Sequence, residues 1–536
     1  MLFNSLEFIL AFVPITLLGF YLLGQRGHPR AAVGWVVLAS LFFYGYWDPG
    51  ATGPTDPWRW WPLGLICSSV LFNYFVGQQL LKKPSKALLG LGVAVNLASI
   101  GYFKYAEFFV RGVVEPLTGA TIGIGDILLP LAISFFTFQQ IAYLVDAYRG
   151  EMRGEGFVNY ALFVTFFPQL IAGPIVHHSE TIPQFAKRET YRPNLDNLSL
   201  GISVFVIGLA KKVILADGIA VYATPVFAAA QAGAEPTLFE AWGGALAYTF
   251  QLYFDFAGYS DMAIGLGLMF NIRIPINFNS PYKAVNIIDF WRRWHITLSR
   301  FLRDYLYIPL GGSRLGPSRR YTNLLITMLL GGLWHGAGWT FVIWGGLHGM
   351  YLVINHAWHA LRRRLGHDLS RSTFLGRVAA RTITFLAVVV GWVYFRAEDF
   401  DAANRILGGM IGLNGVQLPA SYYGMFGPLA PTLEALGWVF QDADGFHFGG
   451  INQVIFLLAL FGITFLLPNT QEWTGYTAPN ADRVDAVEPS LFRRLAAALP
   501  RWRPTLVHGS LLGAVLCWCL LAAFAQTPSE FLYFQF

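Results

Sequence analysis

The chain alternates between long apolar runs and short polar connections, a pattern typical of helices that cross a membrane. A spanning helix needs about 20 predominantly apolar residues. The runs 454–467 and 506–525 contain no Asp, Glu, Lys or Arg, and they lack the alternating polarity of a membrane barrel strand. We therefore predict an all-α polytopic membrane protein of about 11–13 helices. The predicted segments are 2–23, 31–47, 61–81, 87–110, 128–147, 160–176, 198–222, 240–270, 321–335, 338–360, 376–396, 450–468 and 506–525.

Composition supports a single membrane domain over residues 1–536. Hydrophobic residues make up 55% of the chain and charged residues only 13%. A soluble protein of this length needs more charge to cover its surface, and a disordered chain would be far more polar. The three cysteines indicate apolar fillers in spans and no disulfide framework. The net charge of +6 is explained by Lys and Arg in loops, without a nucleic-acid partner.

Loop charges predict the orientation of the chain. Lys and Arg gather in connections such as 271–320 and 362–364, whereas 48–58 and 411–448 contain few of them. By the positive-inside rule the first set faces the cytoplasm and the second faces outward. This places both termini outside. It also requires 160–176 to enter the membrane and return, because the basic residues that follow it belong on the cytoplasmic side.

One polar segment, NIIDFWRRWHITLSRFLRDY at 286–305, has helical spacing and too many charges to span. We predict a basic amphipathic helix in the cytoplasmic interface, followed by a turn that ends at residue 312. Its arginines would meet lipid phosphates or a phosphorylated ligand. An interfacial anchor with one satisfied histidine is the alternative interpretation. Seven side chains divide between two faces: Arg293, Arg300 and Arg303 on one, and Trp291, His295, Leu298 and Leu302 on the other.

Ionisable residues also occur inside apolar runs, where they are costly and indicate function. His335 lies between Trp334 and Gly336 in such a run, and a neutral histidine there could accept a proton. A histidine that only bonds neighbouring helices is the alternative, and we favour that interpretation for His348. Asp255 and Asp261 are about 120° apart on a helix. We expect them in a buried polar network, although a proton path is the alternative.

The motifs together resemble the membrane-bound O-acyltransferase (MBOAT) superfamily. The similarity is greatest to its bacterial branch for alginate O-acetylation, a branch related to the membrane protein of lipoteichoic-acid D-alanylation. The matching stretches are FFYGYWDP (42–49), ISFFTFQQIAYLVDAYRG (133–150), FVTFFPQLIAGPIV (163–176), GLAKKVILAD (208–217), YFDFAGYSDMAIGLGLMFNIRIPINFNSPY (253–282), DFWRRWHITLSRFLRDYLYIPLGG (289–312) and LLGGLWHGAGWTFVIWGGLHG (329–349).

The resemblance implies a ring of tilted and re-entrant helices around a central tunnel in a bacterial cytoplasmic (inner) membrane. It implies His335 as the catalytic base and His295 as the second characteristic position, with no metal. The donor would be acetyl-CoA or another acyl thioester from the cytoplasm. Partners would be an extracytoplasmic acetyltransferase subunit, the machinery of polysaccharide synthesis and export, and membrane lipids. Donor-side candidates are Trp291, Arg292, Arg293 and Trp334.

The segment 526–536 ends in the aromatic sequence FLYFQF. It resembles the C-terminal tail of the accessory protein in D-alanylation systems, where a tyrosine is proposed to carry the acyl group. We therefore hypothesise that Tyr533 is an acyl shuttle on the outer side. A hydrophobic tail at the membrane interface is the alternative.

Two other function classes remain open from the sequence. A proton-coupled secondary transporter could use the buried acids and histidines, although we find no two similar halves of the kind that such folds often have. A non-catalytic membrane scaffold of an export complex is the third candidate. Proton-coupled uptake without acyl-CoA would favour the transporter.

Overall fold

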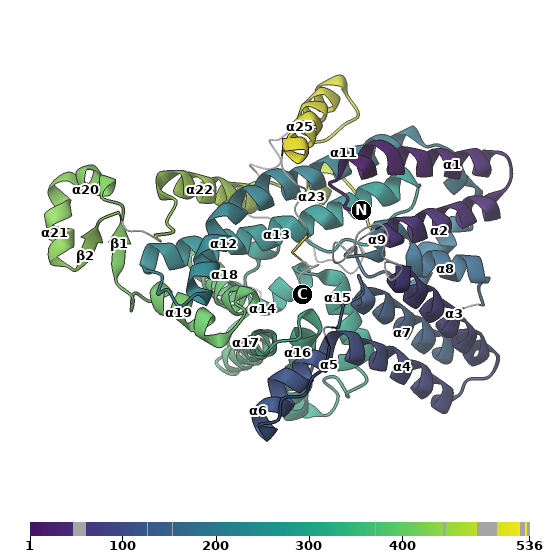
Figure 1. Cartoon of the computed structure of the whole chain (residues 1–536), viewed down its shortest axis with the longest axis horizontal. Coiled ribbons are helices and arrows are strands. Elements are labelled where there is room, and N and C mark those ends of the chain that lie inside the picture. The colour runs from purple at the N-terminus through teal and green to yellow at the C-terminus, as the bar shows by residue number, and fades with distance from the viewer. Residues whose placement is uncertain are drawn as a thin grey trace.

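The computed structural model describes residues 1–46, 60–125, 127–152, 154–369, 371–442, 446–479, 501–525 and 531–532. A helix lies at every predicted apolar segment, and the strands of the described part are two of three residues each. The predicted all-α polytopic fold is therefore confirmed. Figure 1 shows the helices gathered around a central group that contains α13.

Helices of the first part often begin at proline and end at glycine, as capping rules predict. Pro29 starts one helix, and Gly150 ends another in a left-handed conformation with φ of 72°. The elements are α1 (Val13–Gln25), α2 (Pro29–Gly45), α3 (Trp61–Lys82), α4 (Lys86–Ile100), α5 (Ala106–Phe109), α6 (Glu115–Thr118), α7 (Ile133–Arg149), α8 (Phe157–Thr165), α9 (Phe167–Leu170) and α10 (His178–Phe185). The nine residues of α8 are too few to cross a membrane, which agrees with a re-entrant segment.

The second part supplies the centre of the molecule. Its elements are α11 (Leu195–Ala210), α12 (Asp217–Gln231), α13 (Leu238–Met269), α14 (Ile287–Arg293), α15 (Ile296–Leu302), α16 (Gly316–His335), α17 (Trp339–Arg364), α18 (Phe374–Arg396), α19 (Phe400–Met410), β1 (Val416–Leu418), α20 (Ser421–Phe426), α21 (Ala430–Ala435), β2 (Trp438–Phe440), α22 (Gly450–Leu466), α23 (Thr470–Thr474) and α25 (Leu506–Ala525).

Helix α13 forms the core of the fold. Every residue from Ala247 to Met269 is buried. Its backbone packs directly on α11, because glycines face glycines along the contact. A Cβ added to Gly208 would lie 2.6 Å from the Gly258 carbonyl oxygen, and one added to Gly265 would lie equally close to the Gly201 oxygen. The pairing runs in opposite directions along the two helices, so they are antiparallel.

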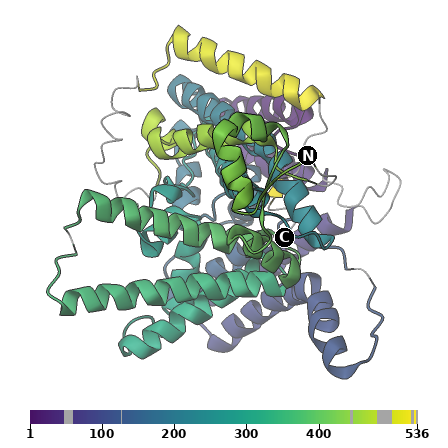
Figure 2. The same cartoon turned by 90° about the vertical axis from the view of Figure 1, so that its left-hand side faces the viewer.

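In the part of the chain that the structure describes, length and apolar composition mark six helical segments as able to cross a membrane: Phe8–Gln25, Trp61–Lys82, Lys86–Thr118, Leu195–Gln231, Phe374–Arg396 and Leu506–Ala525. The last of these, α25, lies along one edge of the molecule in Figure 1 and Figure 2. Only 6% of its apolar window is buried by the rest of the protein. Its exposed apolar surface is suited to lipid.

A small lobe protrudes at the opposite end of the molecule from α4 and α7. It contains α20, α21 and the parallel pair β1 and β2, in which Val416 pairs with Trp438 (Figure 1). The lobe falls within 411–448, the segment that the loop charges predict to face outward.

Candidate active site

His335 is the last residue of α16, and its neighbours hold the helix end in place. The chain turns to an extended conformation at Gly336. A helix leaves its last carbonyl groups without helical partners. Lys104 satisfies two of them: its Nζ donates to the Trp334 oxygen at 2.6 Å and to the His335 oxygen at 3.0 Å. The hydroxyl of Tyr105 donates to the Leu333 oxygen at 2.8 Å.

The His335 side chain is buried among aromatic rings. Its exposed fraction is 4%. Its ring centroid lies 4.9 Å from Trp334, 5.0 Å from Trp344 and 5.3 Å from Phe395. His295 follows at 6.4 Å. The structure thus brings together the two histidines that the resemblance selects, although 40 positions separate them in sequence.

His295 occupies a sharp break in the backbone. It precedes α15 with φ of 43°, a left-handed conformation that is uncommon for a residue other than glycine. Its Nδ1 lies 3.0 Å from Asn277 Oδ1, which also accepts a hydrogen bond from the Thr297 hydroxyl at 2.8 Å. Because the Asn277 amide oxygen only accepts hydrogen bonds, His295 Nδ1 carries the proton in this contact. The contact therefore fixes the orientation of the His295 ring. Strained residues of this kind often mark functional sites.

The break corrects the prediction of one continuous amphipathic helix over 286–305. The structure has two short helices, α14 and α15, separated at Trp294 and His295. The predicted basic face is also divided. Arg293 is buried and pairs with Asp289 at 2.6 Å, whereas Arg303 is exposed.

The donor-side candidates occupy different environments. Arg292 is exposed. Trp291 packs on Trp344 and on His348, with ring centroids 5.9 and 5.3 Å away. His348 is fully buried in this aromatic group, and neither of its ring nitrogens has a hydrogen-bond partner among the described residues, so the predicted bonding to neighbouring helices is not seen. Of the four candidates, Trp334 contacts the His335 ring directly.

Arg300 is buried in a second ion pair that links α15 to α10. Its Nη2 donates to Glu180 Oε2 at 2.9 Å, and Nη1 contacts the other carboxylate oxygen. Burial alone would raise the pKa of Glu180, but the Arg300 guanidinium and the His177 backbone amide hold this pKa below its usual value. Arg300 therefore faces a protein carboxylate, and the predicted contact with lipid phosphate is wrong for this residue.

A cavity of about 620 Å³ lies beside this ion pair. It is lined by four carboxylates and two guanidiniums, so its charge does not favour a polyphosphate. The charged lining residues are Asp146, Glu151, Glu180, Asp304, Arg149 and Arg300.

A column of aromatic rings connects the cavity with the histidines. Tyr305, on the cavity wall, lies 4.9 Å from Phe301, and Phe301 stacks on Phe138 at 4.3 Å. Phe138 in turn stacks on Trp334 at 5.3 Å. Trp334 adjoins His335, so a series of packed aromatic rings connects the cavity wall with the candidate base.

Asp255 and Asp261 form the predicted buried network, but their partners are lysines. Lys212 contacts Asp255 at 2.7 Å, and Lys211 contacts Asp261 at 2.6 Å. The motif GLAKKVILAD contains both lysines, so the sequence held a signal for this pairing. Two buried ion pairs account for these acids without a proton path. Among the described residues no three His, Cys, Asp or Glu side chains are grouped to hold a metal ion.

The described end of the tail lies inside the protein. Phe531 and Leu532 have exposed fractions of 1% and 7%, and both contact residues around α13. This position contradicts an interfacial tail for these two residues. Tyr533 lies outside the described residues.

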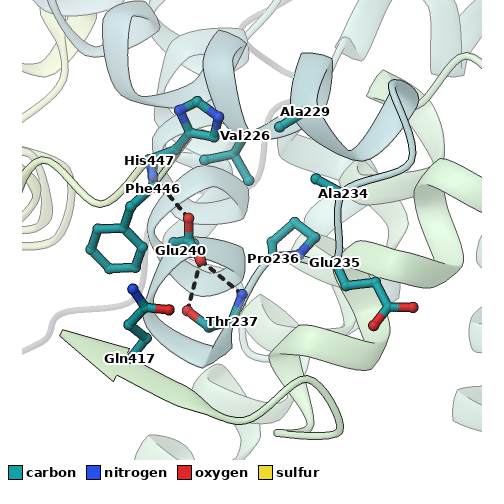
Figure 3. Close-up of a pocket in the computed structure, with 10 residues that line it drawn as sticks. All are labelled: Val226, Ala229, Ala234, Glu235, Pro236, Thr237, Glu240, Gln417, Phe446 and His447. Carbon is teal, nitrogen blue, oxygen red and sulfur yellow. Dashed lines mark hydrogen bonds between the residues drawn. The ribbon is translucent and has the colours of Figure 1, made fainter. Parts of the chain in front are cut away.

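A second, smaller cavity lies at the start of α13 (Figure 3). Its volume is about 140 Å³. The Glu240 carboxylate accepts hydrogen bonds from the Thr237 amide and hydroxyl and from the His447 amide, at 2.7–2.9 Å. Glu240 therefore serves to cap α13 and to fix the 446–448 loop. Asp255 is about 22 Å further along the helix, so this cavity is separate from the histidines.

The comparison with known proteins places these features in a family. The model described as "MBOAT, membrane-bound O-acyltransferase family" matches residues 148–395. The peptidoglycan O-acetyltransferase of Helicobacter pylori is 45% identical, and the alignment covers 78% of this chain and 81% of that protein. The chain belongs to the membrane-bound O-acyltransferase family. It is therefore an enzyme, and the transporter and scaffold interpretations are set aside.

Other MBOAT relatives support the same assignment. The probable alginate O-acetylase AlgI of Pseudomonas aeruginosa is 37% identical, with 100% of both chains covered. The teichoic acid D-alanyltransferase of Streptococcus thermophilus is 29% identical over 48% of this chain and 64% of that protein. The MBOAT match encloses His295 and His335, whereas Lys104 and Phe531 lie outside it.

Sequence reasoning missed Lys104 and Asn277. Lys104 could have been found, because it is an ionisable residue within the predicted span 87–110. Asn277 carries no such signal, since asparagine is common in the turns that its sequence INFNSPY suggests.

Proposed function

We propose that this O-acyltransferase takes an acetyl group from a cytoplasmic thioester and passes it across the bacterial inner membrane for O-acetylation of an exported polysaccharide. The observation that carries the proposal is the arrangement of His335, a buried imidazole at a helix end beside a second buried imidazole. The names of the relatives supply the class of acceptor, because two of them are described as O-acetylating enzymes of peptidoglycan and alginate.

His335 acts as the general base in the proposed reaction. It takes the proton from an acceptor hydroxyl while the oxygen attacks the thioester carbonyl. The carbon–sulfur bond breaks, and His335 returns the proton to the leaving thiolate. His295, held by Asn277, positions the donor or the proton. Exclusion of water and close approach of the reactants supply much of the remaining rate enhancement.

Tyr533 is the proposed first acceptor of the acetyl group. Its phenolic oxygen would form an aryl ester, which is more reactive than an alkyl ester. An extracytoplasmic acetyltransferase partner would then transfer the group to the polymer. The burial of Phe531 and Leu532, the two residues before it, supports an acceptor close to the histidines.

The 620 Å³ cavity is the proposed donor entrance. Its mixed charge is suited to the uncharged arm of a thioester such as acetyl-CoA, and not to the phosphates. The aromatic column from Tyr305 to Trp334 connects this entrance with His335, and the acyl arm would pass beside these apolar rings.

Replacement of two residues tests the proposal. His335→Ala should remove acetyl ester from the exported polymer while the protein is still made and inserted, and His348→Gln provides a buried-histidine control. Tyr533→Phe should give the same loss, whereas Gln535→Ala should not. Normal acetate content in His335→Ala would refute the assignment of the base, and normal content in Tyr533→Phe would refute the shuttle.

A further inference from the structure

The end of the chain meets a charged group deep in the protein. The Leu532 amide donates to Asp255 Oδ2 at 3.0 Å. Asp255 belongs to α13, more than 270 positions away in sequence. A terminal segment is usually poorly ordered unless specific contacts hold it. This hydrogen bond is such a contact.

The charges around Asp255 explain why a backbone amide binds there. The Lys212 ammonium lies 2.7 Å from Asp255 and 2.9 Å from Asp217, so one cation serves two carboxylates. The side chains of Lys212 and Asp255 are only 2% and 3% exposed. A buried carboxylate needs further hydrogen bonds beyond its ion pair. The Leu532 amide supplies one, and hydrogen bonds to charged acceptors are among the stronger ones.

Phe531 adds a second contact to the same lysine. Lys212 Nζ lies 4.9 Å from the centroid of the Phe531 ring, within the range of a cation–π interaction. The edge of the ring meets Tyr259 with centroids 4.4 Å apart. One buried lysine and one buried aspartate therefore each bind one residue of the tail.

This contact site adjoins the two histidines. Phe256 follows Asp255 directly in α13, and its ring packs on His295 with centroids 4.7 Å apart. The site of tail contact and the candidate active site thus share one rigid helical segment. The position of Leu532 on Asp255 therefore determines how far the residues that follow it lie from His295.

We propose that Asp255 and Lys212 are a receptor for the chain's own C-terminal segment and act as positioning residues for it. They fix Phe531 and Leu532 and so limit where the next residue can reach. The catalytic consequence rests on the function proposed above, since it requires an acceptor at Tyr533. The docking itself does not, because it depends only on Phe531 and Leu532.

Asp261 provides a matched control for Asp255. It is also a buried acid of α13, paired with a lysine at 2.6 Å, and it accepts hydrogen bonds from Thr470 and Gln471. These partners belong to other parts of the chain and not to the tail. A general loss of buried charge should therefore affect both acids alike, whereas loss of the receptor should affect only Asp255.

Hydrogen exchange of the C-terminal peptide in the full-length protein tests the docking. Asp255→Asn should make this peptide exchange about tenfold faster, the factor expected for a lost hydrogen bond to a charged group. Asp261→Asn and Tyr533→Phe should leave its exchange unchanged. Unchanged exchange in Asp255→Asn, or equal acceleration in Asp261→Asn, would overturn the receptor.

Leu532→Pro addresses the case in which Asp255→Asn fails to fold. Proline removes the donor amide and leaves the buried ion pair intact, while Leu532→Ile keeps the amide. The proline variant should fold, should exchange faster at the remaining amides of the C-terminal peptide and should lose acetyl transfer. The isoleucine variant should keep the wild-type exchange rate and wild-type acetyl transfer. If Leu532→Pro keeps normal exchange, the receptor is refuted. If exchange rises but Tyr533→Phe is fully active, the receptor stands and the shuttle fails.

Discussion

Gly345→Ala should disable the enzyme by separating two helices at the candidate site. A Cβ at Gly345 would overlap the Met328 carbonyl oxygen of α16 and would lie 3.2 Å from the Gly332 Cα. Neither obstacle is a flexible side chain, so the helices must move. Gly346, the next residue, offers a matched control, because a Cβ there would first meet Leu329 Cδ2 at an ordinary 3.5 Å.

The displacement can be worked out from this overlap. Relief to a normal carbon–oxygen contact of about 3.3 Å requires the backbones to separate by about 1 Å. His335 ends α16 one turn after Gly332, and Trp344 of α17 packs on its ring. A 1 Å misplacement of a catalytic group lowers activity by about 10²-fold. We expect a loss of this size for Gly345→Ala.

The assay is acetyl ester formation on exported polymer, normalised to the amount of folded protein in the membrane. Gly346→Ala should have wild-type activity, because its methyl group meets no backbone. Wild-type activity in Gly345→Ala would show that the close approach of α16 and α17 does not fix His335. Equal loss in both variants would show a general intolerance of alanine in α17.

Three further predictions concern residues around the site. Lys104→Met should lower acetyl transfer by about tenfold without loss of expression, because the carbonyls at His335 lose a charged donor, and Lys104→Arg should restore part of the rate. Asn277→Leu should lower activity in steady-state assays because the imidazole that it orients loses its Nδ1 partner. Arg300→Met should destabilise the protein by about 3–5 kcal/mol in thermal unfolding, since Glu180 remains buried without its cation. The lowered pKa of Glu180 means that the stabilisation is present at neutral pH and is lost as the pH falls through that pKa, and Glu180→Gln should lack this acid-dependent loss.

Most of the helices could be predicted because lipid imposes a simple rule on sequence. A spanning segment must be long and apolar and must satisfy its backbone internally, and these properties are visible along the chain. The prediction of one continuous helix over 286–305 was wrong because it used the local pattern alone. Helical spacing continues through WRRWHIT, whereas the left-handed conformation of His295 depends on contacts with Asn277, which no local pattern reveals.

The arginines of this segment show a second limit of the sequence. A basic stripe is consistent with lipid phosphates, a phosphorylated ligand or protein carboxylates. Arg300 is paired with Glu180, 120 positions away, and Arg293 with Asp289 only one turn away. Amphipathic spacing identifies which residues share a face, but it does not identify what that face meets.

Lys104 follows the rule that an ionisable residue within an apolar span has a specific role. Histidines and acids in apolar runs are candidate sites because they can move protons, whereas Lys104 in the predicted span 87–110 is not among the predicted site residues. The structure gives this lysine a physical reason to be there. Helix α16 ends at His335 among buried aromatic rings, and the Lys104 ammonium donates to two of the carbonyl groups that the helix end leaves without helical partners. A helix that must stop inside a membrane needs a donor from elsewhere, so an unexplained lysine in one span is evidence for a helix end beside it.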